Sequence, residues 1–309
     1  MKDKILFIFN PVSGQSQIRN HLVDILDVLS TDDNEIICYP TKKHGDASRI
    51  VRERTDDYKY VVCAGGDGTL DEVVNGMMES PDKTFVPIGY IPCGTTNDFA
   101  ASLGIPTDMA SAAKIVKSGH AVNCDLGMFV GGKEEKRKEY FVYVAAFGLF
   151  TGTSYDTPQD LKNTFGHLAY IMQGVQELGN LQTFHVHAET DQLTVSDEFA
   201  FGMISNSKSV GGFPNPAGDS VNLSDGIFEV LLVKMPRNLI EINDIIQFMS
   251  QGSDYSELVY RFRTSRIVIE SEEKIRWTLD GEYGGAYKRV SMQNLQQKLQ
   301  IIVPADVRL

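Results

Sequence analysis

Short apolar runs alternate with amphipathic stretches along the first 120 or so residues of the chain. Continuous apolar runs indicate strands that are buried on both faces, and apolar residues at helical spacing indicate the helices that cover them. The pattern predicts strands at 5–9, 35–39, 58–63 and 85–91, and helices at 18–29, 46–54, 70–78 and 110–116. This βαβα alternation predicts a parallel sheet with helices on both faces.

The pattern changes after about Asp125. Short strand candidates now follow one another between turns rich in Gly, Pro, Asn and Asp. They lie at 141–146, 183–188, 199–204, 228–233, 265–269, 275–279 and 299–303, with helices near 161–176 and 239–250. We therefore expect an α/β protein with an N-terminal parallel-sheet domain (1–125) and a second, β-rich sandwich or barrel domain (126–303). The last residues, about 304–309, are expected to return to the first domain.

Composition and charge argue against several classes of protein. The chain has 309 residues, 42% of them hydrophobic, and a formal net charge of -12, which argues against broad electrostatic binding to nucleic acid or to an anionic membrane. No apolar run approaches the roughly 18 residues that span a bilayer, and the apolar stretch at 5–9 is too short for a signal peptide. The four cysteines lack zinc-binding spacing, and Cys38, Cys63 and Cys93 lie at or near the ends of apolar runs. We expect a cytoplasmic protein with buried, reduced thiols.

The loops that follow the predicted strands carry the candidate chemistry, because ligands of open parallel sheets bind beyond the carboxyl ends of the strands. Asn10 to Gly14 follows the first strand, and alone it favours an ordinary turn. Three glycines at 65, 66 and 68 follow the third strand; they permit positive φ and place N–H groups against an anion. Asp67 lies between them. A carboxylate beside phosphates implies a cation, and Mg²⁺ with a nucleotide supplies one.

The loop after the fourth strand repeats these features. It contains Gly94, the hydroxyl of Thr95 and the carboxylate of Asp98. Neighbouring parallel strands open at the same edge of the sheet, so we expect Asp67 and Asp98 to approach one site, and two carboxylates near phosphates favour a metal ion. The loop at 64–69 lacks the Walker A pattern, and a tight strand-to-helix turn is its alternative interpretation.

Several segments together resemble the diacylglycerol kinase catalytic-domain family, which includes sphingosine and ceramide kinases and the soluble bacterial lipid kinases. GGDGTLDEVVNG at 65–76 resembles the family's signature, and PCGTTNDFA at 92–100 resembles its second signature. Further similarities lie at 10–14, at Thr41, and at 44–47, 224–226 and 279–282. The likeness covers nearly the whole chain and is greatest to the soluble bacterial diacylglycerol kinases. The chain departs from the family at Asp71, where Asn is usual, and at Gln15, where a basic residue is common.

The resemblance implies roles for individual residues. Asp280 would be the general base, and Asp67, Asp98 and Asp125 would organise Mg²⁺. Asp225, with the backbone carbonyls of Asn222 and Ile227, would hold a second, structural Mg²⁺. The residues implied to line the nucleotide are Asn10, Ser13, Gly14, Thr41, Gly66, Asp67, Gly68, Thr69, Glu72 and Thr95.

The implied activity is transfer of the γ-phosphate of ATP to the hydroxyl of diacylglycerol, which gives phosphatidic acid. Such an enzyme would work peripherally at the inner membrane surface, with Lys162 as a candidate lipid-surface contact; a homodimer stays open. The alternatives are a kinase for another lipid, such as phosphatidylglycerol, a sphingoid base or a ceramide, and an inactive regulator that binds only nucleotide or lipid. A NAD kinase shares the GGDGT segment but lacks the run at 95–100 in this form.

Overall fold

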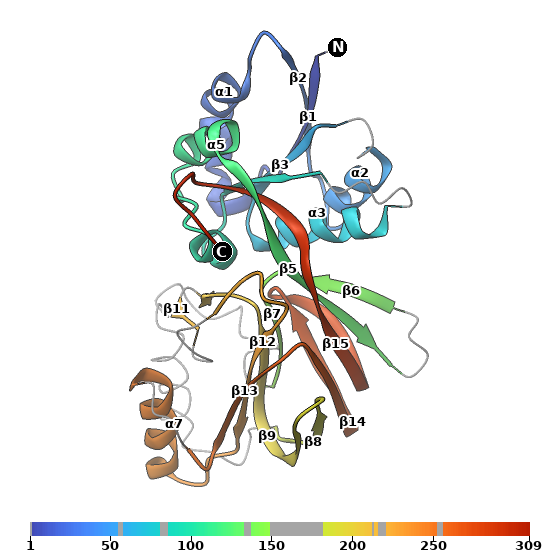
Figure 1. The fold of residues 1–309 in the computed structure, drawn as a ribbon, viewed down its shortest axis with the longest axis vertical. Helices are drawn as coiled ribbons and strands as arrows, with labels where there is room; N and C mark the ends of the chain where they lie inside the picture. The colour runs from blue at the N-terminus through green and yellow to red at the C-terminus, as the bar shows by residue number, and fades with distance from the viewer. Residues whose placement is uncertain are drawn as a thin grey trace. The chain divides into compact units, whose positions relative to one another are not determined.

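The computed structural model describes residues 2–54, 58–80, 86–132, 137–148, 182–211, 213–215, 221–251 and 256–309. The predicted helix at 161–176 and the proposed membrane contact at Lys162 lie outside these residues. The chain divides into two compact units (Figure 1). The first comprises Met1–Leu126, Leu223–Asp225 and Leu295–Leu309, and the second comprises Gly127–Asn222 and Gly226–Asn294.

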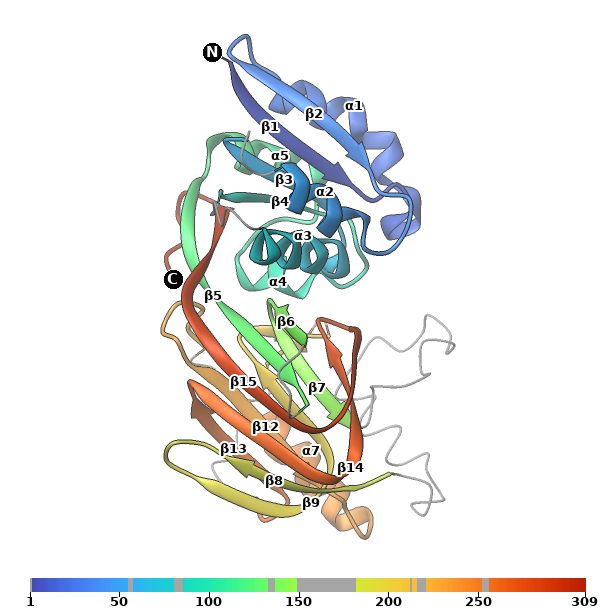
Figure 2. The same cartoon turned by 90° about the vertical axis from the view of Figure 1, so that its right-hand side faces the viewer.

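The first unit is built on a parallel sheet in the order β2–β1–β3–β4, to which the end of β15 adds a further parallel strand. On one face of the sheet α1 packs with α5, and on the other α2 packs with α3 (Figures 1 and 2). The elements are β1 (Asp3–Phe9), η1 (Ser13–Ser16), α1 (Ile18–Leu29), β2 (Asn34–Pro40), α2 (Asp46–Arg54), β3 (Tyr60–Gly65), α3 (Asp67–Glu79), β4 (Ile88–Pro92), α4 (Asp98–Ser102) and α5 (Met109–Ser118).

Burial explains this layered arrangement. Residues 5–8 of β1 are at most 1% exposed, since helices cover both faces of the central strands. Strand β2 is different, because it lies at the edge of the sheet and alternates between partly buried and exposed positions. Cys38 on this strand is therefore exposed, and its expected burial was wrong, whereas Cys63 and Cys93 are buried as expected.

The second unit is an antiparallel β structure around one aromatic core. Its single tryptophan, Trp277, is 1% exposed and contacts Phe129 and Phe147. The elements are β6 (Arg137–Phe141), β7 (Val144–Gly148), β8 (Phe184–Glu189), β9 (Thr194–Ser205), β10 (Ser209–Val210), β11 (Phe213–Pro214), β12 (Phe228–Lys234), α7 (Leu239–Gln251), β13 (Val259–Thr264) and β14 (Arg266–Leu279).

Two long strands have residues in both units: β5 (His120–Gly131) and β15 (Glu282–Val303). The chain returns to the first unit at Leu295, earlier than the return that we expected at about residue 304. An α/β fold with a parallel-sheet domain and a β-rich domain is confirmed. Among the residues described, the helices are all too short or too polar to cross a membrane.

Candidate active site

Three loops of the first unit meet at the carboxyl ends of β1, β3 and β4. A β-carbon built on Gly14 would lie 1.8 Å from the carbonyl oxygen of Cys93, and one built on Gly94 would lie 2.7 Å from the Cα of Gly66. The backbones therefore touch where a side chain would separate them. Gly14 also has φ +53°, a conformation that residues with a side chain rarely adopt. The sequence-predicted loops at 10–14, 65–69 and 92–98 thus form one surface of backbone groups.

The glycines after β3 serve a different purpose from the expected one. Gly65, Gly66 and Gly68 are not among the described glycines that have positive φ, so the prediction of positive φ in this loop was wrong. Helix α3 begins at Asp67, which places Gly68 in its first turn, and Gly66 precedes the helix with extended backbone at φ -84° and ψ -176°. The absence of a side chain at Gly66 permits close approach to Gly94. The first N–H groups of α3 have no intrahelical acceptor and favour an anion.

Two carboxylates converge at this surface, as the sequence predicted. Asp67 and Asp98 are the first residues of α3 and α4. The Asp67 carboxylate accepts a hydrogen bond from the Asp98 N–H at 3.1 Å, and the Asp98 side chain belongs to a residue only 1% exposed. Burial, and next the charge of Asp98, raise the pKa of Asp67 to about 6. Two carboxylates this close together are an arrangement that a bound divalent cation would stabilise.

Asp125 is not part of a three-carboxylate group with this pair. It is fully buried; its carboxylate accepts the Gln297 N–H at 2.7 Å, and its own N–H donates to the Leu223 carbonyl at 2.7 Å. In the part of the chain that the structure describes, no group of three or more His, Cys, Asp or Glu side chains is placed so that it could hold a metal ion. Asp125 therefore connects three distant segments of the first unit, and the cation prediction rests on Asp67 and Asp98.

Glu72 has a structural set of contacts. Its two carboxylate oxygens accept the N–H groups of Gly45 at 2.7 Å and Ala47 at 3.0 Å, and the Nδ1 atom of His44 lies 3.1 Å away. These donors lie at the N-terminal end of α2, where N–H groups lack intrahelical partners. Glu72, which the family resemblance assigned to nucleotide binding, thus joins α3 to the segment at 44–47, which the resemblance matched to the start of a helix.

The remaining predicted nucleotide residues surround the same loops. The Oγ atom of Ser13 lies 3.6 Å from the β-carbon position of Gly66. Asn10 accepts the Val12 N–H at 3.1 Å, which shapes the first loop. The Thr41 N–H donates to the carbonyl of Phe9, the last residue of β1. Thr69 is buried in the first turn of α3, whereas Thr95 is exposed.

Sequence reasoning missed two residues of this site. Asn97 is 3% exposed and adopts a left-handed conformation at φ 54° directly before α4. Its amide accepts the Gly94 N–H at 2.9 Å and donates to the Gly94 carbonyl at 2.8 Å, so it fixes the shape of the fourth loop. Tyr90 on β4 places its hydroxyl beside the Asp67 carboxylate. Asn tolerates the left-handed region better than most residues, which was a usable signal.

In the second unit, Asp280 occupies the turn between β14 and β15 with φ 49°. It is 3% exposed, and its carboxylate accepts three backbone N–H groups: Val142 at 2.5 Å, Tyr143 at 3.0 Å and Val144 at 2.9 Å. Its own N–H donates to the Val144 carbonyl at 2.8 Å. The predicted general base is thus an ordered carboxylate that also holds the start of β7.

The predicted structural cation site falls on the turn before β12. Asp225 belongs to the first unit, whereas Asn222 and Ile227 belong to the second. Gly226 has φ 78°, which suits the tight turn that the Asp-Gly sequence at 225–226 predicts. The carbonyl of Ser224, within the first unit, accepts the side-chain amides of Gln296 and Gln297 at 3.2 and 3.3 Å.

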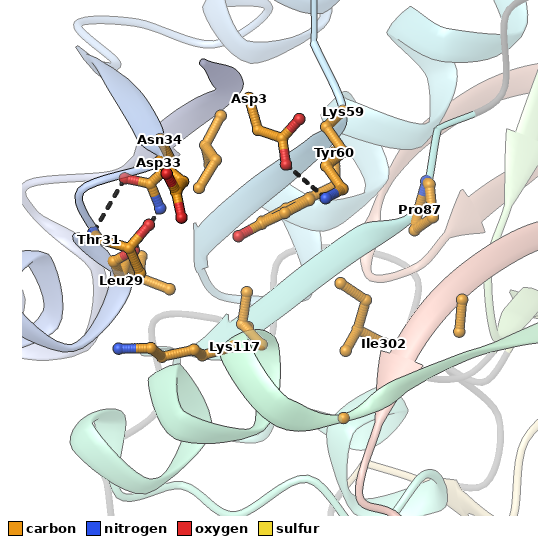
Figure 3. A pocket seen from close by; sticks show the side chains of 14 residues that line it. Asp3, Leu29, Thr31, Asp33, Asn34, Lys59, Tyr60, Pro87, Lys117 and Ile302 are labelled. Carbon is orange, nitrogen blue, oxygen red and sulfur yellow. Dashed lines mark hydrogen bonds and ion pairs between the residues drawn. The ribbon is translucent and has the colours of Figure 1, made fainter. Parts of the chain in front are cut away.

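A separate pocket of about 360 Å³ lies at the amino ends of the parallel strands, opposite the loops described above (Figure 3). Apolar residues such as Ile302 line it beside the Tyr60 ring, and Lys59 pairs with Asp3 at its rim, 2.5 Å apart. Burial raises the pKa of Tyr60, with a further contribution from the charge of Asp3. Among the described residues that line this pocket, none is a site residue predicted from the sequence.

Similarity to known proteins decides the family. The model of the diacylglycerol kinase catalytic domain matches residues 4–129. A diacylglycerol kinase of Staphylococcus carnosus is 33% identical over 311 residues, which cover 100% of this chain and 97% of that protein. The chain belongs to the diacylglycerol kinase family. The family resemblance and the enzyme class expected from the sequence are thereby confirmed.

Solved structures agree with this placement. The crystal structure of a putative diacylglycerol kinase from Bacillus anthracis has a TM-score of 0.79 and 26% identity, covering 99% of both chains. A yeast NADH kinase structure has a TM-score of 0.54 at 12% identity and covers 99% of this chain and 84% of that one. The latter shows a shared fold alone. As a member of the diacylglycerol kinase family, the chain is a transferase that uses ATP as co-substrate and a lipid as phosphate acceptor.

Proposed function

We propose that this kinase transfers the γ-phosphate of ATP to the free hydroxyl of diacylglycerol and so produces phosphatidic acid. The observation that carries the proposal is the contact of the three loops at the carboxyl ends of β1, β3 and β4, beside the Asp67–Asp98 pair. Backbone N–H groups, the N-terminal end of α3 and two carboxylates are what a phosphate chain and its cation require. The diacylglycerol kinases of Staphylococcus carnosus and Bacillus anthracis, to which the chain is similar, support this choice of lipid.

The nucleotide would bind with its phosphates against the three loops, lined by the residues named from the family resemblance. Asp67 and Asp98 would hold Mg²⁺, and the raised pKa of Asp67 supports this, since a bound cation would offset the burial and the neighbouring charge of Asp98 that raise it. When bound, Mg²⁺ would neutralise the charge that develops on the transferring phosphate. Asp225, with the carbonyls of Asn222 and Ile227, is proposed to hold a second, structural Mg²⁺.

Asp280 is proposed as the general base that accepts the proton of the lipid hydroxyl. The three N–H groups that point at its carboxylate stabilise the ionised form, and only the ionised form can accept a proton. They also fix its orientation, which proton transfer requires. We further propose that the enzyme works at the membrane surface, because its substrate resides there.

The test is a substrate panel. Purified enzyme is incubated with γ-labelled ATP, Mg²⁺ and mixed micelles that contain diacylglycerol, phosphatidylglycerol, a sphingoid base or a ceramide, and NAD is supplied in a parallel reaction. We expect label in phosphatidic acid above all. Preferential labelling of another lipid would retain the lipid kinase and reject the substrate. The Asp67→Asn variant serves as the control, since it keeps the side-chain size and loses one proposed Mg²⁺ ligand.

A further inference from the structure

Tyr90 has a polar environment that its place in an apolar strand conceals. The residue lies inside β4 and is 1% exposed. Its hydroxyl oxygen lies 3.4 Å from the carbonyl oxygen of Gly65, 3.5 Å from Oδ1 of Asp67 and 3.4 Å from Oδ1 of Asn97. A phenol has one proton to donate, and each of these three atoms is an acceptor. The hydroxyl thus lies between the loop after β3 and the loop after β4.

The other contacts of these oxygens indicate where the proton points. The Gly65 carbonyl already accepts the Cys93 N–H at 2.7 Å. The Asn97 oxygen already accepts the Gly94 N–H at 2.9 Å. Both acceptors are neutral, whereas Asp67 is the anionic one, and hydrogen bonds to an ionised acceptor are about twice as strong. The charge of its carboxylate therefore makes Asp67 the acceptor that the hydroxyl favours.

The Asp67 carboxylate is consequently held from two sides. Its Oδ2 accepts the Asp98 N–H at the start of α4, and its Oδ1 faces the Tyr90 hydroxyl from β4. A carboxylate fixed at both oxygens keeps one orientation, and a cation ligand works best when neighbouring groups fix its orientation. Phe at position 90 would fill the same buried space without this donor.

We infer that Tyr90 is a positioning residue that orients the Asp67 carboxylate for Mg²⁺, an inference that rests on the proposed magnesium role of Asp67. The Tyr90 hydroxyl makes no covalent bond and transfers no proton. Its effect is limited to the part of nucleotide affinity that Mg²⁺ contributes.

Calorimetry on the Tyr90→Phe variant tests this role through binding and without turnover. The dissociation constant of ATP is measured with Mg²⁺ and with EDTA, and the ratio gives the enhancement by Mg²⁺. We expect Tyr90→Phe to lower that enhancement about tenfold and to leave ATP affinity in EDTA unchanged. Tyr58→Phe is the matched control: it removes another buried phenol, 7% exposed and placed before β3, and should keep the wild-type ratio.

A wild-type ratio in a folded Tyr90→Phe protein would overturn the inference, and so would an equal loss of affinity with and without Mg²⁺, because that marks a purely structural role. In an Asp67→Asn background, Tyr90→Phe should change the ratio no further; additive effects would overturn the inference as well. A wild-type enzyme that binds ATP equally with Mg²⁺ and with EDTA would reject the magnesium proposal itself. The lipid assay is independent of these results.

Discussion

Asp280→Asn separates the structural role of this buried carboxylate in the second unit from its proposed chemical role. The substitution keeps the shape and one acceptor oxygen. If that oxygen keeps the N–H groups of Tyr143 and Val144, the new amide NH₂ faces the N–H of Val142, donor against donor. A buried donor left without an acceptor costs about 1–3 kcal/mol, and loss of the charge from the two remaining bonds costs about 1 kcal/mol more. We expect the free energy of unfolding to fall by about 2–4 kcal/mol.

The assay uses the protein's own reporter. Trp277 is the single tryptophan, is 1% exposed and lies on β14 near Asp280, so its fluorescence during urea unfolding follows the second unit. Asp191→Asn, at an exposed turn of the same unit, is the matched control and should stay within about 0.5 kcal/mol of wild type. A stability of Asp280→Asn equal to that of the control would refute the reasoning from hydrogen bonds.

Turnover is then measured at urea concentrations below the unfolding transition. Removal of a general base should lower kcat by roughly two to four orders of magnitude. ATP affinity should stay nearly unchanged, because the proposed nucleotide residues lie in the first unit. Normal turnover in the folded variant would remove Asp280 from the chemistry and leave it a structural residue, whereas loss of ATP binding would place it at the nucleotide.

Three further predictions concern the first unit and its cations. Gly94→Ala should weaken ATP binding at least about tenfold, because its β-carbon would push against Gly66; unchanged affinity by calorimetry would contradict the loop contact. The pKa of Asp67, about 6, exceeds its unfolded value, so in metal-free protein the ionised side chain opposes folding. The free energy of unfolding should therefore fall by up to about 2–3 kcal/mol as pH rises from about 4 to 6; circular dichroism should show no such slope in Asp67→Asn. Mg²⁺ should raise the Tm of wild type more than that of Asp225→Ala, and equal increases would count against the structural cation.

The first unit was largely predictable because its strands are buried on both faces and appear as continuous apolar runs. The convergence of Asp67 and Asp98 followed from one rule, that neighbouring parallel strands open at the same edge. The positions of α3 and Gly68 did not follow, since a run of glycines is compatible with both positive φ and close backbone contact. Only the approach of Gly94 decides between them.

Contacts between distant segments escaped prediction. Asp125 and Gln297 are 172 positions apart, and Asp280 and Val142 are 138 apart. In each pair, the sequence around one residue has no local pattern that indicates its partner, because a hydrogen bond from a backbone N–H group requires no particular residue type at the donor. Tyr90 was missed for another reason: an aromatic residue within an apolar strand is typical of a core, and its hydroxyl has a role only through three oxygens on other segments.

The pairing of β15 with β4 has a consequence for synthesis on the ribosome. Ile88 and Gly89 pair with Ile301 and Ile302, so one side of β4 acquires its neighbour only when those late residues have been made. At about 5–20 residues per second, the roughly 200 residues between them take about 10–40 s. During that interval the nascent chain carries an apolar strand with an open edge, which is a template for pairing with other chains. The first unit of this kinase therefore completes its sheet last, although most of it is translated first.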